Sequence, residues 1–176
     1  MIFHRLGLVN KNQMGFTLIE VLAVFAISGI VISGITMTFY QLVIGSASTN
    51  NHMIAVRQVQ NAGYWVSYDA PSAQSVNLGA SSGFPLTLSW TDWDSTVKTV
   101  TYSLEGTELW RDSNGQQSLV ARFIDPAPAE TNVEFTDTNG DGADDTLILR
   151  VTIVVGGGLQ QQSETREYRI VPRPGL

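Results

Sequence analysis

The chain has 176 residues, a length that predicts one folded domain with at most one additional segment. Its 10 basic and 16 acidic side chains give a formal net charge of -6, which disfavours binding of nucleic acid by bulk electrostatics. The sequence has no Cys and 2 His, which excludes disulfides, thiolate metal sites and Cys nucleophiles and leaves multi-histidine metal centres without ligands.

The first feature along the chain is an apolar segment from Phe16 to Ile35, which contains a single charged residue, Glu20. At about 1.5 Å rise per residue, a helix of this length crosses about 30 Å of hydrocarbon. The residues before this segment include basic side chains but no acidic ones. The positive-inside rule therefore places the N-terminus in the cytoplasm and the chain after Ser46 outside. The segment is longer than the apolar core of an ordinary cleaved signal peptide, which spans about 7 to 15 residues.

Glu20 is energetically unfavourable within such an apolar segment. A carboxylate costs roughly 2.5 to 3.5 kcal/mol at the centre of a membrane helix and somewhat less near the interface. The sequence therefore predicts either a plain signal anchor with an incidental Glu20 or a carboxylate that finds a cationic partner in the membrane.

A family signature is visible between Gln13 and Gly34, in the segment QMGFTLIEVLAVFAISGIVISG. It resembles the N-terminus of type IV pilins and of the pseudopilins of type II secretion, and Gly15, Phe16 and Glu20 match its diagnostic places. The resemblance implies that a prepilin peptidase cleaves between Gly15 and Phe16 and methylates the new amine of Phe16. Residues 1–15 are then a cytoplasmic leader that is removed, and residues 16–45 are a transmembrane and assembly helix.

The same resemblance gives Glu20 a partner, because the amine of Phe16 can neutralise the Glu20 carboxylate of an adjacent subunit. Breaking a buried ion pair strands one charge at a cost of about 3 to 5 kcal/mol, so such a pair fixes the register of assembly. The implied partners are prepilin peptidase, other pilin or pseudopilin subunits and the inner-membrane assembly platform. The implied location is the inner (cytoplasmic) membrane, crossed once, with an exported C-terminal domain, and then the pilus or pseudopilus filament.

A helical pattern continues beyond the membrane to about residue 69, where Ala70-Pro71-Ser72 forces an extended or turn conformation. We expect the aromatic residues between Gly63 and Asp69 in the core and Asn50, Asn51 and His52 in solvent. An apolar stripe at helical spacing is expected to lie on a sheet; it consists of Val43, Ala47, Ala55, Val59, Ala62 and Val66.

From Val76 to Val171 the chain alternates apolar and polar residues and predicts antiparallel strands. Asn114-Gly115 predicts a hairpin turn, and the three glycines from Gly156 to Gly158 predict a flexible loop. The predicted strand segments contain Leu86 to Trp90, Val100 to Leu104, Leu109 to Arg111, Ser118 to Phe123, Val133 to Phe135, Leu147 to Ile153 and Thr165 to Val171. The predicted fold class is α+β, with a long N-terminal helix packed on one antiparallel sheet and an exported pilin-like domain over residues 46–176.

The segment VTYSLEGTELWR, from Val100 to Arg111, is similar in style to minor pilins and minor pseudopilins of the J or W type. This similarity implies a subunit of low copy number at a filament tip or in an initiation complex.

The loop from Asp137 to Asp145 resembles the first nine positions of calcium loops of the EF-hand, dockerin or thrombospondin type 3 kind. Calcium takes six to eight oxygen ligands, which acidic and amide side chains on alternate residues can supply around a glycine turn. Ile148 occupies the twelfth position, where a bidentate carboxylate is usual, and Asn-Gly and Asp-Gly also form turns without metal. The predicted ligands are Asp137, Asn139, Asp141, the carbonyl of Ala143, and Asp145.

The sequence thus predicts a non-enzymatic structural subunit of a type IV filament system. The alternative is a monomeric, membrane-anchored extracytoplasmic calcium-binding β domain. This alternative assigns no function to Glu20. An exported hydrolase is disfavoured because the sequence lacks a paired-acid or nucleophile motif. A cluster of Arg166, Arg169 and Arg173 is the one candidate for binding phosphate, and we expect it to be solvated instead.

Overall fold

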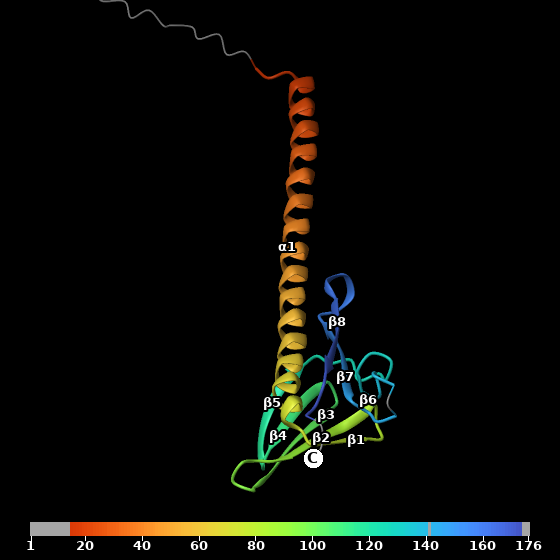
Figure 1. The fold of residues 1–176 in the computed structure, drawn as a ribbon. Coiled ribbons are helices and arrows are strands. Elements are labelled where there is room, and N and C mark those ends of the chain that lie inside the picture. The colour runs from red at the N-terminus through yellow and green to blue at the C-terminus, as the bar shows by residue number, and fades with distance from the viewer. Residues whose placement is uncertain (1–14, 141, 174–176) are drawn as a thin grey trace, which may run out of the picture. The chain divides into compact units, whose positions relative to one another are not determined.

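The computed structural model describes residues 15–140 and 142–173. Within these residues a long helix, α1 (Leu18–Asp69), precedes eight strands and two short 3₁₀ helices, η1 (Ala70–Ser72) and η2 (Gly158–Gln160) (Figure 1). The chain divides into two compact units, Met1–Val43 and Ile44–Leu176.

In the first unit, the described residues form the N-terminal part of α1 and expose their apolar side chains on all sides. Phe25, Ile30 and Phe39 are 72%, 74% and 64% exposed. A helix that is apolar all round requires an apolar environment, which here is a membrane or neighbouring helices.

In the second unit, five strands form an antiparallel meander in the order β1-β2-β3-β4-β5. Three further strands form a second antiparallel sheet in the order β6-β7-β8. The strands of the first sheet are β1 (Ser75–Gly79), β2 (Gly83–Thr91), β3 (Val97–Glu105), β4 (Glu108–Ser113) and β5 (Gln116–Arg122). Those of the second are β6 (Asn132–Thr136), β7 (Thr146–Val155) and β8 (Gln162–Ile170).

The prediction of a single sheet was therefore wrong. The segment between β5 and β6 contains Pro126 and Pro128, which lack the N–H that a continuous strand ladder needs. An isolated bridge between Ile124 and Ile153 joins this segment to β7.

The core confirms the predicted α+β fold class, because α1 packs its small apolar stripe against the strands. Ala55, Val59, Ala62 and Val66 are fully buried, as the periodicity predicts. They meet the inward side chains of the sheets, among them Leu86, Leu88, Val100, Tyr102, Leu147, Leu149, Val151 and Ile153. The Asn114-Gly115 turn joins β4 to β5 with positive φ at both residues, as a two-residue hairpin turn requires.

Four local predictions were wrong. The first placed the aromatic residues between Gly63 and Asp69 in the core. Tyr64 and Tyr68 are 61% and 65% exposed, because at 100° per residue they lie on the face of α1 opposite Ala62 and Val66.

Val43 is 62% exposed and so lies outside the buried stripe. The Asn51 side chain is not free in solvent, since its amide donates to the carbonyl of Gln160 at 2.8 Å. That carbonyl belongs to η2, which begins at Gly158, so part of the predicted loop is a short helix held to α1.

Gly63 permits a close approach between α1 and the second sheet. A Cβ at this position would lie 2.0 Å from Cζ of Tyr168 on β8, so the tyrosine ring occupies the space of the missing side chain. The Tyr168 hydroxyl donates to the carbonyl of Val59 at 3.0 Å.

The end of α1 is joined to the first sheet by a buried charged group, Asp69, which is 3% exposed. Arg111 on β4 donates from Nε at 2.7 Å and from Nη2 at 2.9 Å to the two Asp69 oxygens. The hydroxyl of Tyr102 on β3 donates to the same carboxylate. Burial, together with the hydrogen bond to Asp69, raises the pKa of Tyr102, so its hydroxyl remains a donor. The Arg111 guanidinium also lies 4.9 Å from the ring centre of Trp65.

Candidate functional site

The first candidate site is the N-terminal end of the described chain, where Gly15, Phe16 and Thr17 precede α1 in non-helical conformation. Phe16 is 85% exposed. The peptide bond between Gly15 and Phe16 thus lies outside the helical hydrogen-bond ladder. An enzyme can reach this bond without unwinding a helix.

Glu20 and Thr17 cap the start of α1 reciprocally. The backbone N–H and the hydroxyl of Thr17 each donate to Glu20 Oε2 at 3.0 Å. The backbone N–H of Glu20 donates to Thr17 Oγ1 at 3.3 Å. This arrangement is a capping box, which satisfies backbone donors that the first helical turn leaves free.

The capping box holds the Glu20 carboxylate through one oxygen. Within residues 15–140 and 142–173, Oε1 of Glu20 accepts no hydrogen bond. A carboxylate has about four acceptor positions, so the capped side chain retains capacity for a cation. Sequence reasoning missed Thr17, although the pattern T-x-x-E from Thr17 to Glu20 is a recognised helix-start signal.

Hydroxyl groups within the apolar helix are satisfied by the helix itself. Ser33 donates to the carbonyl of Gly29 at 2.8 Å, and Thr36 donates to that of Ile32 at 2.9 Å. Such back-bonds remove the cost of placing a hydroxyl in hydrocarbon, where water is absent. By length and composition, α1 can cross a membrane.

The second candidate site is the acidic loop between β6 and β7. Asp137 accepts the backbone N–H groups of Gly140 at 2.6 Å and Gly142 at 2.7 Å, one on each carboxylate oxygen. These hydrogen bonds, first that from Gly142, lower the pKa of Asp137. Asp145 Oδ1 accepts from the hydroxyls of Thr146 and Thr138 at 2.7 and 2.8 Å, and these bonds lower its pKa.

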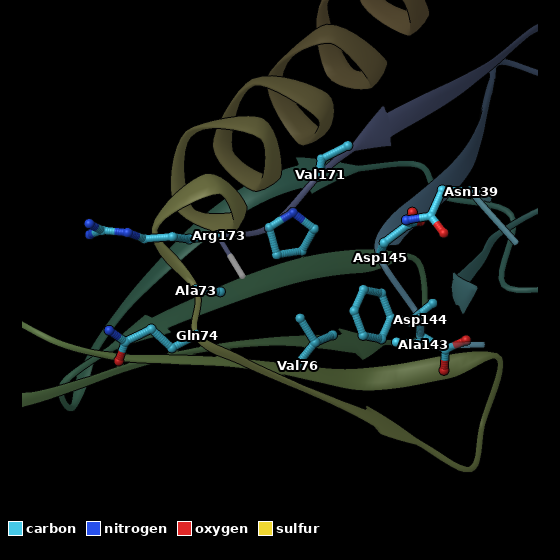
Figure 2. Close-up of a pocket in the computed structure, with 11 residues that line it drawn as sticks. Ala73, Gln74, Val76, Asn139, Ala143, Asp144, Asp145, Val171 and Arg173 are labelled. Atoms are coloured by element: carbon cyan, nitrogen blue, oxygen red, sulfur yellow. The ribbon is translucent and has the colours of Figure 1, made fainter. Parts of the chain in front are cut away.

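The structure describes four of the five predicted calcium ligands. The carboxylates of Asp137 and Asp145 accept hydrogen bonds from N–H and O–H donors. Within the described part of the chain, no group of three or more acidic or His side chains lies close enough together to hold a metal ion. Asn139, Ala143 and Asp145 line one hollow of about 370 Å³, which also contains Phe135 (Figure 2). Asp141 lies outside the described residues. The calcium site stays a prediction.

The arginine cluster does not form a basic patch. Arg166 pairs with Glu164 at 3.2 Å and Arg169 pairs with Glu167 at 2.8 Å, both along β8. These pairs neutralise the strand locally and leave it poorly suited to phosphate.

Comparison with known proteins addresses the N-terminal site. Residues 10–36 match the family described as Prokaryotic N-terminal methylation motif. The match includes Gly15, Phe16 and Glu20, so the chain carries a prepilin signature of the type IV pilin and pseudopilin kind. No curated protein and no solved structure matches the chain.

Proposed function

We propose that this chain, a prepilin-type precursor, is a structural subunit of a type IV pilus or of a type II secretion or competence pseudopilus. The observation that carries the proposal is the methylation motif over residues 10–36, placed at the start of an apolar helix that can cross a membrane. Prepilin peptidase cleaves after Gly15 and methylates Phe16. The subunit then assembles from the inner membrane through α1.

The geometry of the helix start supports assembly by charge pairing. Cleavage converts the nitrogen of Phe16 into an amine, while the Thr17 cap holds the Glu20 carboxylate at the helix end. A neighbouring subunit's amine placed against Glu20 cancels two charges that are costly in hydrocarbon. A motif of this kind points to a structural role rather than to catalysis.

The mature N-terminus provides the direct test. We expect the protein extracted from its own membranes to have the mass of a chain that begins at N-methyl-Phe16, as measured on the intact protein and on its N-terminal fragment. A chain that still begins at Met1, or that is cut after Ser46, contradicts the proposal.

The segment from Val100 to Arg111 is similar to minor pilins and minor pseudopilins. This similarity favours a minor subunit, present in few copies at a filament tip or in an initiation complex. Counting copies against the most abundant subunit in purified filaments tests this assignment. Equal abundance along the filament contradicts it.

We also propose a structural calcium ion in the loop from Asp137 to Asp145. Support comes from the alternating oxygen-bearing residues and from Gly140 and Gly142, whose φ of 82° and 90° produce the sharp turns that such loops need. When bound, the ion would tie β6 to β7.

For a dissociation constant of about 10⁻⁴ to 10⁻³ M, ~10 mM calcium stabilises the folded chain by roughly 1.4 to 2.7 kcal/mol. We therefore expect the Tm of the detergent-solubilised chain to be roughly 3 to 10 °C higher in calcium than in EDTA. Asp141→Ala should abolish the difference. An identical wild-type Tm in both conditions favours the metal-free turn.

A further inference from the structure

The tip of the β7–β8 hairpin, residues 156–161, lies against α1 at the start of the second unit. The side-chain amide of Asn51 donates to the carbonyl of Gln160 at 2.8 Å. The side-chain amide of Gln162, just after the tip, donates to the hydroxyl of Ser48 at 2.9 Å. These contacts hold the tip beside the residues of α1 through which the chain enters the second unit.

Both segments at this end of the unit lack charged side chains. Between Ile44 and Arg57 on α1 the sequence has no Asp, Glu, Lys or Arg, and His52 is the one titratable group. Between Arg150 and Glu164, which enclose the whole tip, there is no titratable side chain. Of the 10 basic and 16 acidic side chains of the chain, 2 basic and 1 acidic precede Ile44, so the second unit carries 8 and 15, a net charge of -7. The unit thus has one neutral end on an acidic body.

The neutral end presents an apolar side chain to its surroundings. Leu159, in the middle of the tip, is 82% exposed, and Met53 on the adjacent part of α1 is 47% exposed. The side of the tip that faces α1 is already filled, since a Cβ at Gly156 would lie 2.4 Å from Nδ2 of Asn51. An exposed leucine among uncharged amide groups suits a surface that offers both apolar groups and hydrogen-bond acceptors.

The membrane that α1 can cross is such a surface, and the chain leaves it close to this end. The part of α1 in the first unit, from Leu18 to Val43, is about 38 Å long at about 1.5 Å per residue. A bilayer with its headgroups is about 40 to 45 Å thick. With Leu18 at the cytoplasmic surface, the chain enters the second unit near the outer edge of the headgroup layer, and Ser48 follows about one helical turn later.

We propose that the tip of the β7–β8 hairpin docks on the headgroup layer of the membrane in which α1 is anchored. Leu159 enters the layer between the lipids, and the glutamine amides of the tip donate to lipid carbonyl and phosphate oxygens. The tip stays at headgroup depth, because the backbone of its glycines needs hydrogen-bond partners that hydrocarbon lacks. The neutral end also avoids the repulsion that the acidic body would meet at anionic lipids.

The docked tip belongs to the anchored chain before assembly, so this inference goes beyond the filament function and requires only that α1 spans the membrane. Helix and tip are two separate attachments, and together they restrict the rotation of the second unit above the bilayer. A subunit that waits in the membrane is then already oriented.

The test uses the full chain in nanodiscs of phosphatidylcholine, with a nitroxide spin label as the reporter. The chain has no Cys, so Gln161→Cys and Trp93→Cys each create a single labelling site. Gln161 is an exposed residue at the end of the tip, and labelling it leaves Leu159 in place. We expect the label at 161 to be up to about tenfold less accessible to a water-soluble nickel complex than the label at 93, which corresponds to burial of one leucine side chain.

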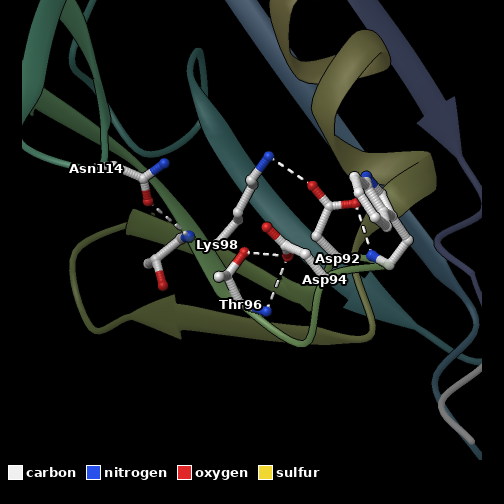
Figure 3. Close-up of polar contacts among 7 residues, drawn as sticks. Asp92, Asp94, Thr96, Lys98 and Asn114 are labelled. Carbon is white, nitrogen blue, oxygen red and sulfur yellow. Dashed lines mark hydrogen bonds and ion pairs between the residues drawn. The ribbon is translucent and has the colours of Figure 1, made fainter.

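Position 93 is the matched control, because Trp93 is 92% exposed on a turn at the other end of the helix. This turn lines a hollow together with Pro71, which follows α1 directly. It is ordered but charged, since Lys98 Nζ lies 2.6 Å from Asp92 Oδ2 (Figure 3). The two labels thus report on ordered turns of the same unit, of which one is proposed to meet the membrane.

Substitutions of Leu159 separate docking from proximity to the bilayer. Leu159→Asn removes the apolar group and should raise the accessibility of the label at 161 to that of the label at 93. Leu159→Met keeps an apolar side chain and should preserve the protection. Added salt or anionic lipid should leave the protection unchanged, because the tip carries no charge. A native near-ultraviolet circular dichroism spectrum of Leu159→Asn separates loss of docking from unfolding.

Three results overturn the docked tip. The first is equal accessibility at positions 161 and 93 in the chain that retains Leu159. The second is protection at position 161 that survives Leu159→Asn, because the leucine then contributes nothing. The third is protection that appears only with anionic lipid, since an uncharged tip gives no such dependence.

Discussion

Replacement of Glu20 by Leu is expected to abolish incorporation into filaments while leaving membrane insertion and cleavage after Gly15 intact. The change makes the apolar segment more hydrophobic, so the anchor persists. It also leaves the Phe16 amine of a neighbour without its carboxylate, at a cost of about 3 to 5 kcal/mol if that amine is buried. At 1.4 kcal/mol per tenfold, incorporation should fall roughly 10²- to 4 × 10³-fold, measured as the ratio of protein in purified filaments to protein in membranes.

Variants of the capping box separate charge pairing from helix capping. Thr17→Ser keeps a hydroxyl cap and should assemble normally, whereas Thr17→Ala loses the cap at a cost of about 1 kcal/mol and should show a smaller defect than Glu20→Leu. Glu20→Gln keeps the side-chain size and should fail as Glu20→Leu does. If Glu20→Leu leaves incorporation into filaments unchanged, the result contradicts the filament proposal. It then favours the alternative of a monomeric calcium-binding domain.

Replacement of Arg111 by Met is expected to destabilise the second unit strongly. It leaves the carboxylate of Asp69, 3% exposed, without its two charge-assisted hydrogen bonds. Breaking a buried ion pair by removing one partner costs about 3 to 5 kcal/mol. The Tm of the detergent-solubilised chain should fall by roughly 6 to 20 °C, as followed by near-ultraviolet circular dichroism.

A matched variant controls for loss of a surface arginine. Arg122→Met removes a pair with Glu108, 3.3 Å apart, in which the arginine side chain is 58% exposed. Such pairs contribute about 0 to 1 kcal/mol, so Tm should change by no more than about 4 °C. The double variant Asp69→Asn with Arg111→Met should recover part of the stability, because the buried charge is gone. Equal Tm losses for Arg111→Met and Arg122→Met would show that the Asp69 network is not a major stabilising feature.

The sequence alone determined the elements whose signals are local. The apolar run after Gly15, the carboxylate of Glu20 and the stop at Pro71 specify the helix, because length, charge and backbone geometry act within a few residues. Alternation likewise specified the inward side of β7, where Leu147, Leu149 and Val151 are fully buried. The prepilin signature belongs to the same class, since its residues are contiguous.

Only the tertiary structure decided which distant residues meet. Asp69, Tyr102 and Arg111 lie on three elements, and no local pattern joins them, because their contact depends on strand register and on the rotation of α1. The same is true of the ring of Tyr168 over Gly63. Burial and close packing are properties of the assembled layers, so the pairing of charges and rings is fixed when the sheets and helix come together.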